Sequence, residues 1–278
     1  MKKIFERLPV AILLVTISVL SSAGLSSRAA GWVVAWGRND SGQTNVPATL
    51  TNAVMVRGGL YHGLALNADS SLSGWGDTSD GQMPFPSDAT NSLAIAAGGY
   101  HSLALKPDGT VSAWGDFSYG QTDVPLDLTN AVAIAGGFYH SLALRADGRV
   151  SAWGPGTNNI GVDPNYGQTI IPATVSNIVA ISAGGWHSLA LKNDGTVYAW
   201  GRDTFGETDV PLGLTNVVAI AAGAAHSLAL KADGTVRAWG DNTYGETNIP
   251  PGLAGVVAIA AGGWHNLALL TNGIVRAW

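Results

Sequence analysis

The sequence predicts an all-β protein, a β-propeller made of 39-residue blades with three strands each. Two observations lead to this prediction. A tryptophan recurs every 39 residues, with one interval of 47, and all six histidines keep the same spacing inside phrases similar to GGYHSLAL. A fixed period of this length is typical of solenoids and propellers. The repeated residues are Trp36, Trp75, Trp114, Trp153, Trp200, Trp239 and Trp278, and His62, His101, His140, His187, His226 and His265.

Each repeat reads as three short strands. In the repeat at 131–154 they are AVAIAGG (131–137), HSLALR (140–145) and RVSAWG (149–154). Asp147-Gly148 separates the second strand from the third and predicts a tight antiparallel hairpin with left-handed backbone. The glycine pair between the first and second strands is also expected to adopt positive φ.

These small sheets cannot be stable alone, because their strands are apolar on both faces. Stacking the copies around an axis covers both faces, which favours a propeller. A parallel β-helix is the alternative, but the antiparallel hairpins inside each repeat argue against it.

The strand count predicts six complete blades and one spare strand. There are six copies of the first and second strands but seven of the third, and the spare copy is WVVAWG at 32–37. We therefore expect a repeat domain over 32–278 that is incomplete at its C-terminus. About 30 more residues, by the repeat spacing, would close a seven-bladed ring. The alternative is a six-bladed protein that stops at Trp278.

The first 23 residues have the pattern of a secretory signal peptide. A basic start, MKKIFER, is followed by the apolar run LPVAILLVTISVL and by small residues. Cleavage is expected after Ala23, or as late as residues 29–30. The run is shorter than the ~20 residues of a membrane span, although an uncut anchor is the alternative. We expect a secreted or periplasmic monomer that makes no membrane contact after cleavage.

The net charge and the absence of cysteine exclude some classes of partner and of metal site. The net charge is −5, and removal of the signal peptide would make it −7. No basic stripe is present to neutralise phosphates, so a nucleic-acid partner is not expected. The chain has no cysteine, which excludes disulfides and thiolate metal sites.

Two long phrases resemble a known family. AIAAGGYHSLALKPDGTVSAWGDFSYGQT (94–122) and AIAAGAAHSLALKADGTVRAWGDNTYGET (219–247) are similar to repeats of the regulator-of-chromosome-condensation family. The resemblance extends over 32–278. That family's founding member is a nucleotide-exchange factor with longer repeats that acts on chromatin. Because this chain has short repeats, an acidic charge and an export signal, nucleotide exchange is not expected.

The repeat length and the connection similar to AWGDN..GQT.VP also resemble the bacterial secreted propellers that inhibit β-lactamases. This resemblance implies a seven-bladed ring that binds an enzyme through one face by means of aromatic loop residues. It also implies that the protein has no catalytic activity and no cofactor.

The repeated histidines and tryptophans are interpreted as structural. Two histidines on one zinc must lie within ~4 Å of each other, which a ring of blades prevents except at its axis. We expect each imidazole to bond backbone at its turn, and each Trp-Gly tryptophan to pack between blades. Calcium at the Asp- and Asn-rich loops after the third strands is conceivable, but these loops vary and Asx turns explain them. No metal site is predicted.

Aromatic residues form the candidate partner-binding site. Five precede histidines, and five more lie in the loops that follow the third strands. Both sets should open on the same face of the ring, because the first and third strands run in the same direction. Large exposed aromatic patches are typical of binding sites; the alternative is that these rings only cover the turns. They are Tyr61, Tyr100, Tyr139, Trp186 and Trp264, with Phe117, Tyr119, Tyr166, Phe205 and Tyr244.

The sequence thus predicts an exported, non-catalytic propeller that binds a protein, such as a secreted enzyme. The specific alternatives are a β-lactamase inhibitor and a carbohydrate-binding lectin with one weak site per repeat. An enzyme is not expected, because no copy assembles a nucleophile, a base and an orienting group. The insert at Pro155–Val162 is a candidate recognition loop on the aromatic face.

Overall fold

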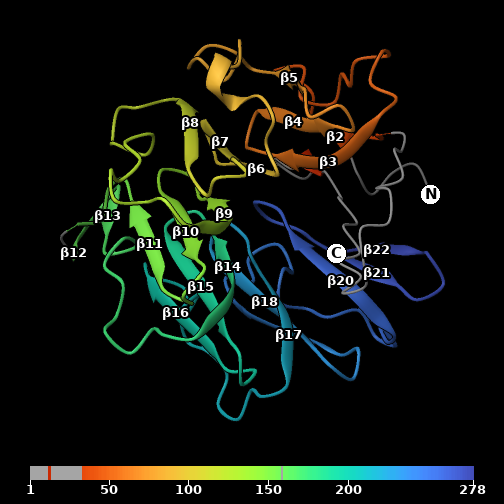
Figure 1. Ribbon diagram of the computed structural model, residues 1–278. Coiled ribbons are helices and arrows are strands. Elements are labelled where there is room, and N and C mark those ends of the chain that lie inside the picture. The colour runs from red at the N-terminus through yellow and green to blue at the C-terminus, as the bar shows by residue number, and fades with distance from the viewer. Residues whose placement is uncertain (1–11, 14–32, 158) are drawn as a thin grey trace.

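The computed structural model describes residues 12–13, 33–157 and 159–278. Six three-stranded antiparallel sheets follow one another along the chain, which confirms the predicted all-β propeller of six blades (Figure 1). Within the described residues, the only helix is the 3-10 turn η1 (Ser87–Ala89), and no helix there is long and apolar enough to cross a membrane. The blades are β3–β5 (Ala53–Gly58, His62–Asn67, Leu72–Gly76), β6–β8 (Ala94–Ala97, His101–Leu105, Val111–Gly115), β9–β11 (Ala131–Gly136, Ser141–Arg145, Val150–Trp153), β14–β16 (Ile178–Ala183, His187–Lys192, Val197–Gly201), β17–β19 (Val217–Ala222, His226–Lys231, Val236–Gly240) and β20–β22 (Val256–Ala261, Asn266–Leu270, Val275–Ala277).

The first strand of each blade lies innermost. These strands, from β3 round to β20, line a central channel of about 740 Å³. The second strand lies in the middle of each sheet and is buried along nearly its whole length, because neighbouring blades cover both of its faces. The apolar pattern on both faces of the strands therefore has a direct structural cause.

Tryptophans of the third strands fill the space between blades. Trp200, for example, packs with Leu142 and Leu144 of the preceding blade. Its indole Nε1 also donates to the carbonyl oxygen of Gln168, 32 residues earlier, at 2.9 Å. The same 32-residue bond recurs at Trp75, Trp114, Trp239 and Trp278.

The series of packed blades is open at one place. Each first strand packs against the next from β3 to β20, and this packing does not recur between β20 and β3 in the part of the chain that the structure describes. The spare third strand appears as β2 (Trp36–Gly37), and among the described residues its one strand partner is β1 (Ile12–Leu13). Trp36 is 40% exposed, whereas its counterparts Trp75 to Trp239 are buried.

The two kinds of turn differ from each other. The Asp-Gly turns have positive φ as predicted, for example 78° at Gly148. In the copy without glycine, Ser70 adopts the same conformation with φ of 64°. The prediction for the Gly-Gly pair was wrong, because Gly98 and Gly137 do not have positive φ. A Cβ on Gly98 would lie 2.3 Å from Cε1 of His101, so this glycine is required to make room for the imidazole.

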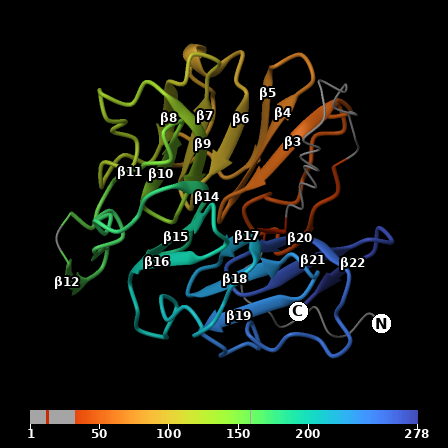
Figure 2. The same ribbon diagram turned by 60° about the horizontal axis from the view of Figure 1, so that its bottom comes forward.

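The long repeat carries a small ribbon of its own. β12 (Asn159–Val162) pairs with β13 (Asn165–Tyr166) in an antiparallel sheet. In Figure 2 this ribbon lies at the periphery of the ring, beside the third strands of its neighbouring blades. The eight-residue insertion thus lengthens the loop that follows the third strand β11 without changing the blade itself.

Candidate partner-binding face

Two sets of loops meet at one face of the ring. The first set consists of the turns between first and second strands. The second set consists of the six segments that follow the third strands, which we call the exit loops. Backbone hydrogen bonds join the two sets: Asp116 N donates to Tyr100 O at 3.0 Å, and Arg202 N donates to Trp186 O at 2.9 Å. The exit loops are residues 38–46, 77–83, 116–124, 155–171, 202–210 and 241–249.

Four aromatic side chains of the turns form a continuous row across neighbouring blades. The ring centroids of Tyr61 and Tyr100 are 5.8 Å apart, those of Tyr100 and Tyr139 are 5.5 Å apart and stacked, and those of Tyr139 and Trp186 are 6.3 Å apart. All four side chains are partly exposed. Burial, and after it the proximity of Tyr139 and Tyr61, raises the pKa of the Tyr100 hydroxyl.

Aromatic residues of the exit loops extend this row outwards. Tyr119 packs edge-on against Tyr139 at 5.5 Å, and Tyr166 packs edge-on against Trp186 at 6.5 Å. Phe117 is 76% exposed, and Phe205 and Tyr244 are also exposed. We call the ten predicted residues together the aromatic face.

The row does not continue round the whole ring. Ala225 stands where the other copies have an aromatic side chain, so the row stops after Trp186. Among the described residues, Trp264, Tyr244 and Phe117 make no ring-to-ring contact with the others. The continuous part of the aromatic face therefore covers the first four blades.

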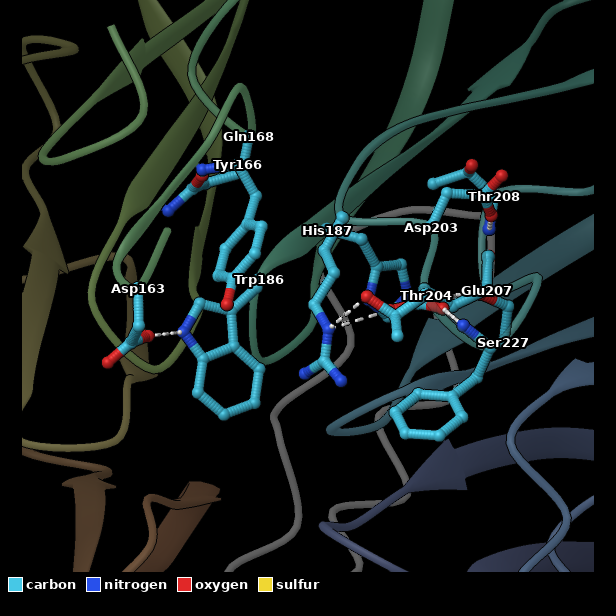
Figure 3. A network of polar contacts seen from close by, with 12 residues as sticks. Asp163, Tyr166, Gln168, Trp186, His187, Asp203, Thr204, Glu207, Thr208 and Ser227 are labelled. Atoms are coloured by element: carbon cyan, nitrogen blue, oxygen red, sulfur yellow. Dashed lines mark hydrogen bonds and ion pairs between the residues drawn. The ribbon is translucent and has the colours of Figure 1, made fainter. Parts of the chain in front are cut away.

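Trp186 is the most constrained ring of the face (Figure 3). Its indole Nε1 donates to Asp163 Oδ1 at 2.6 Å, and Phe138 packs edge-on against it at 5.1 Å. The guanidinium of Arg202 lies 4.9 Å from the centroid of the indole. A ring held by a hydrogen bond and by two neighbours presents a fixed shape to an approaching molecule.

Arg202 lies among three aromatic rings. Its guanidinium carbon is 4.9 Å from the Phe205 centroid and 5.7 Å from the Tyr166 centroid, in addition to its contact with Trp186. Nε donates to Thr204 Oγ1 at 3.1 Å and forms an ion pair with Glu207 at 3.5 Å. Burial raises the pKa of Glu207.

Sequence reasoning missed Phe138, Asp163 and Arg202. Arg202 could have been found, since the corresponding position after Trp-Gly is aspartate in three other repeats, at Asp77, Asp116 and Asp241. Asp163 directly follows the insert Pro155–Val162, and nothing in the sequence indicated its contact with Trp186, which lies 23 residues later in the chain.

The histidines lie beneath the aromatic face and between the blades. His101 Nε2 is 2.8 Å from Ser141 Oγ of the next blade, and Ser141 Oγ donates to Gln121 O. The partner is thus a hydroxyl of the next blade, and not backbone within the turn as we expected. Because the serine gives its only proton to the carbonyl, the imidazole must donate from Nε2.

This arrangement recurs from blade to blade. His62, His140 and His187 pair with Ser102, Ser188 and Ser227, and His226 pairs with Asn266. Burial lowers the pKa of His101, His140 and His187 to about 3. His265, in the last blade, has no hydrogen-bond partner for either ring nitrogen among the described residues.

A metal site is not evident in the described residues, where no group of three or more histidine, aspartate or glutamate side chains could hold an ion. The aspartates of the exit loops instead accept bonds from their own backbone, as Asp116 Oδ1 does from Ser118 N at 2.9 Å. These are the Asx turns that the sequence suggested.

Comparison with known families shows to which family the repeats belong. The model of the regulator of chromosome condensation (RCC1) repeat matches residues 93–121, 131–168, 178–207, 217–246 and 256–278, which together are more than half of the chain. The chain belongs to the RCC1 repeat family. The match to 131–168 spans the inserted ribbon, so the long repeat is an RCC1 repeat with an extended exit loop. No curated protein sequence matches the chain.

Solved structures share the RCC1 fold with this chain at low sequence identity. Prp20p from Saccharomyces cerevisiae is 24% identical, with a TM-score of 0.69, and the match covers 84% of this chain and 73% of Prp20p. The ectodomain of the Arabidopsis thaliana receptor kinase ACR4 is also 24% identical, with a TM-score of 0.67, and the match covers 92% and 89%. The ectodomain of Physcomitrella patens CR4 is 21% identical, with a TM-score of 0.67, over 88% and 66%.

Proposed function

We propose that this chain is an exported, non-catalytic RCC1-type propeller that binds a protein partner through its aromatic face. The observation that carries the proposal is the continuous row Tyr61–Tyr100–Tyr139–Trp186, partly exposed and flanked by exposed rings of the exit loops. Tyrosine and tryptophan contribute most of the binding free energy at many interfaces. The N-terminal pattern of charge and hydropathy supports export.

The burial of polar groups supports a binding role over a catalytic one. The histidines, which would be the first candidates for acid–base catalysis, are buried between blades, and this burial lowers the pKa of His101, His140 and His187 to about 3. Membership of the RCC1 family is consistent with protein binding, since yeast RCC1 has been crystallised with Kap60 bound to it.

A secreted β-lactamase is the specific partner that the sequence resemblance suggests, and a carbohydrate is the alternative ligand. The contacts between neighbouring rings favour a protein over separate sugars. A lectin with one site per blade needs equivalent, separate platforms, whereas Tyr100 contacts the rings on both sides of it.

The test compares three forms of the mature chain: the parent, the double variant Tyr100→Ala/Trp186→Ala, and the control Leu126→Ala/Leu212→Ala. Both leucines are fully exposed. Leu126 lies away from the aromatic face, beside Asp127, which pairs with Arg145 at the far end of β10. Each form is immobilised and exposed to a bacterial secretome, to purified class A β-lactamase and to a glycan array.

We expect the parent and the leucine control to retain the same protein, and the aromatic variant to lose at least about 100-fold in affinity, equivalent to ~2.7 kcal/mol. Retention and inhibition of the β-lactamase would favour the function of a β-lactamase inhibitor. Binding to glycans alone would favour the lectin. Equal retention by all three forms would refute the proposed face.

A further inference from the structure

The exit loops carry a strong excess of negative charge. They contain eleven acidic residues and two basic ones, whereas the turns between first and second strands, at the same face, contain no charged residue. The acidic residues are Asp40, Asp77, Asp80, Asp116, Asp123, Asp163, Asp203, Glu207, Asp209, Asp241 and Glu246, and the basic residues are Arg38 and Arg202.

The opposite face is closer to balance. There, five acidic side chains pair with lysine or arginine, as Lys192 does with Asp194 at 3.0 Å and Arg149 with Asp147 at 2.7 Å. Three further pairs lie at the same face, formed by Lys106, Arg145 and Lys231. The aspartates Asp69 and Asp108 instead accept bonds from Ser71 N and Thr110 N in their own turns. The excess negative charge of the domain is therefore concentrated around the aromatic rings.

Several acidic side chains of the exit loops bond to backbone N–H groups and not to cations. Asp77 Oδ1 accepts from Ser79 N at 2.9 Å, and Asp241 Oδ1 accepts from Thr243 N at 3.0 Å. The hydrogen bond from Ser79 N lowers the pKa of Asp77. The described residues provide ion pairs at this face only for Asp40, with Arg38, and for Glu207, with Arg202.

The rings already bind one cation of the protein itself. Arg202 stacks within 6 Å of three centroids, the geometry in which a guanidinium is attracted to an aromatic face. Among the described residues no cation lies over Tyr119, Tyr139 or Tyr244. These rings, with Asp116 and Asp241 in the same exit loops as Tyr119 and Tyr244, combine an aromatic surface with an anion.

We propose that the partner of the aromatic face presents a basic protein surface, with arginine and lysine side chains that contact the tyrosine rings and the exit-loop carboxylates. This inference rests on the proposed function and adds the chemistry of the partner. Complementary charge accelerates encounter and excludes acidic partners. It also excludes polyanions such as nucleic acid from this face.

The probe is a displayed library of random 12-residue peptides, selected on the immobilised mature chain. Individual peptides are then measured against the parent, against Tyr100→Ala/Trp186→Ala, and against Asp77→Asn/Asp116→Asn/Asp241→Asn. Asparagine preserves the oxygen that accepts the backbone bond and removes the charge. At Asp116 it also removes the acceptor of the 2.9 Å bond from Gln121 Nε2. The matched control is Asp108→Asn/Asp147→Asn/Asp194→Asn, which changes the net charge equally at the opposite face.

We expect the selected peptides to have net positive charge and to lose binding to the aromatic variant. The asparagine variant of the aromatic face should bind them about 10-fold more weakly, and raising the salt from 50 to 500 mM should weaken parent binding by a similar factor. The opposite-face control should bind as the parent does.

Two results would overturn the inference, and they are distinguishable. Peptides that need Tyr100 and Trp186 but are neutral or acidic would refute the basic partner and leave the proposed function standing. Peptides whose binding does not depend on the two rings would refute the proposed function and the inference together.

Discussion

Two adjacent residues in every repeat have opposite positions in the fold. His140 is fully buried and bonds to the next blade, whereas Tyr139, one residue earlier, is partly exposed and contacts other rings of the aromatic face. Successive side chains of a strand point to opposite faces of the sheet. That alternation does not by itself explain the difference, because the two residues lie where the turn meets the strand. The histidine is present in all six copies, while the aromatic position holds tyrosine, tryptophan or alanine. The difference teaches that one position is fixed by packing between blades, whereas the other lies at the surface, where several side chains fit.

Acidification should have the largest effect, because it acts on all the histidines at once. Burial lowers the pKa of His62 and His265 to about 4 and of His101, His140 and His187 to about 3, from an ordinary value of 6.5. A group whose pKa is lowered in the folded state contributes its full stability above pH 6.5 and loses it as the pH falls toward the folded pKa. Each such histidine should therefore lower the free energy of unfolding by about 1.4 kcal/mol per pH unit between pH 6 and pH 5.

Urea denaturation at pH 7, 6 and 5 measures this slope. The variant His140→Gln cannot take up the proton at this position. Its free energy of unfolding should therefore fall less steeply with decreasing pH, by the contribution of one histidine. A free energy of unfolding that is constant from pH 7 to pH 5 would contradict the buried, neutral histidines.

A single substitution at each of the two positions gives the next largest effect. His140→Ala removes a buried ring and leaves Ser188 without its donor, and should lower the free energy of unfolding by about 3 kcal/mol. Tyr139→Ala removes a partly exposed ring and should cost about 1 kcal/mol, while it weakens partner binding. Urea unfolding at pH 7 compares the two variants.

His265→Ala is the control for the bond between blades. His265 lacks a hydrogen-bond partner in the described residues, so its loss should cost less than the loss of His140. Equal costs at the two histidines would indicate that the imidazole stabilises the fold by its volume and not through the hydroxyl of the next blade.

The smallest effect concerns the hydrogen bond that holds Trp186. Asp163→Ala removes the acceptor of the indole N–H, whereas Asp163→Asn retains an oxygen there. We expect the first variant to shift the Trp186 indole N–H resonance and to bind the partner a few-fold more weakly, with a stability change below ~1 kcal/mol because the bond is exposed. The second variant should resemble the parent.

The measurement is a two-dimensional NMR spectrum in which the signal that is missing in Trp186→Phe identifies Trp186. An unchanged indole signal in Asp163→Ala would show that Phe138 and Arg202 hold the ring without the hydrogen bond.

Much of the fold follows from periodicity in the sequence. The 39-residue spacing, the Asp-Gly turns and the apolar pattern on both strand faces predicted three-stranded blades, and the blades form at those positions. The role of the Gly-Gly pair was not predictable in the same way. Gly98 is required by the imidazole of His101 and not by its own backbone conformation, and such a close approach leaves no trace in a local pattern.

The aromatic face, too, was predictable from the sequence only in part. The sequence by itself determined which aromatic residues share a face, because strand direction fixes where each loop opens. Only the tertiary structure decided which of these rings touch, that the row stops beyond Trp186, and that Arg202 and Asp163 flank its last ring. The physical reason is that contacts between blades join residues some 40 positions apart, whose distance depends on how the blades pack and not on the pattern within any one repeat.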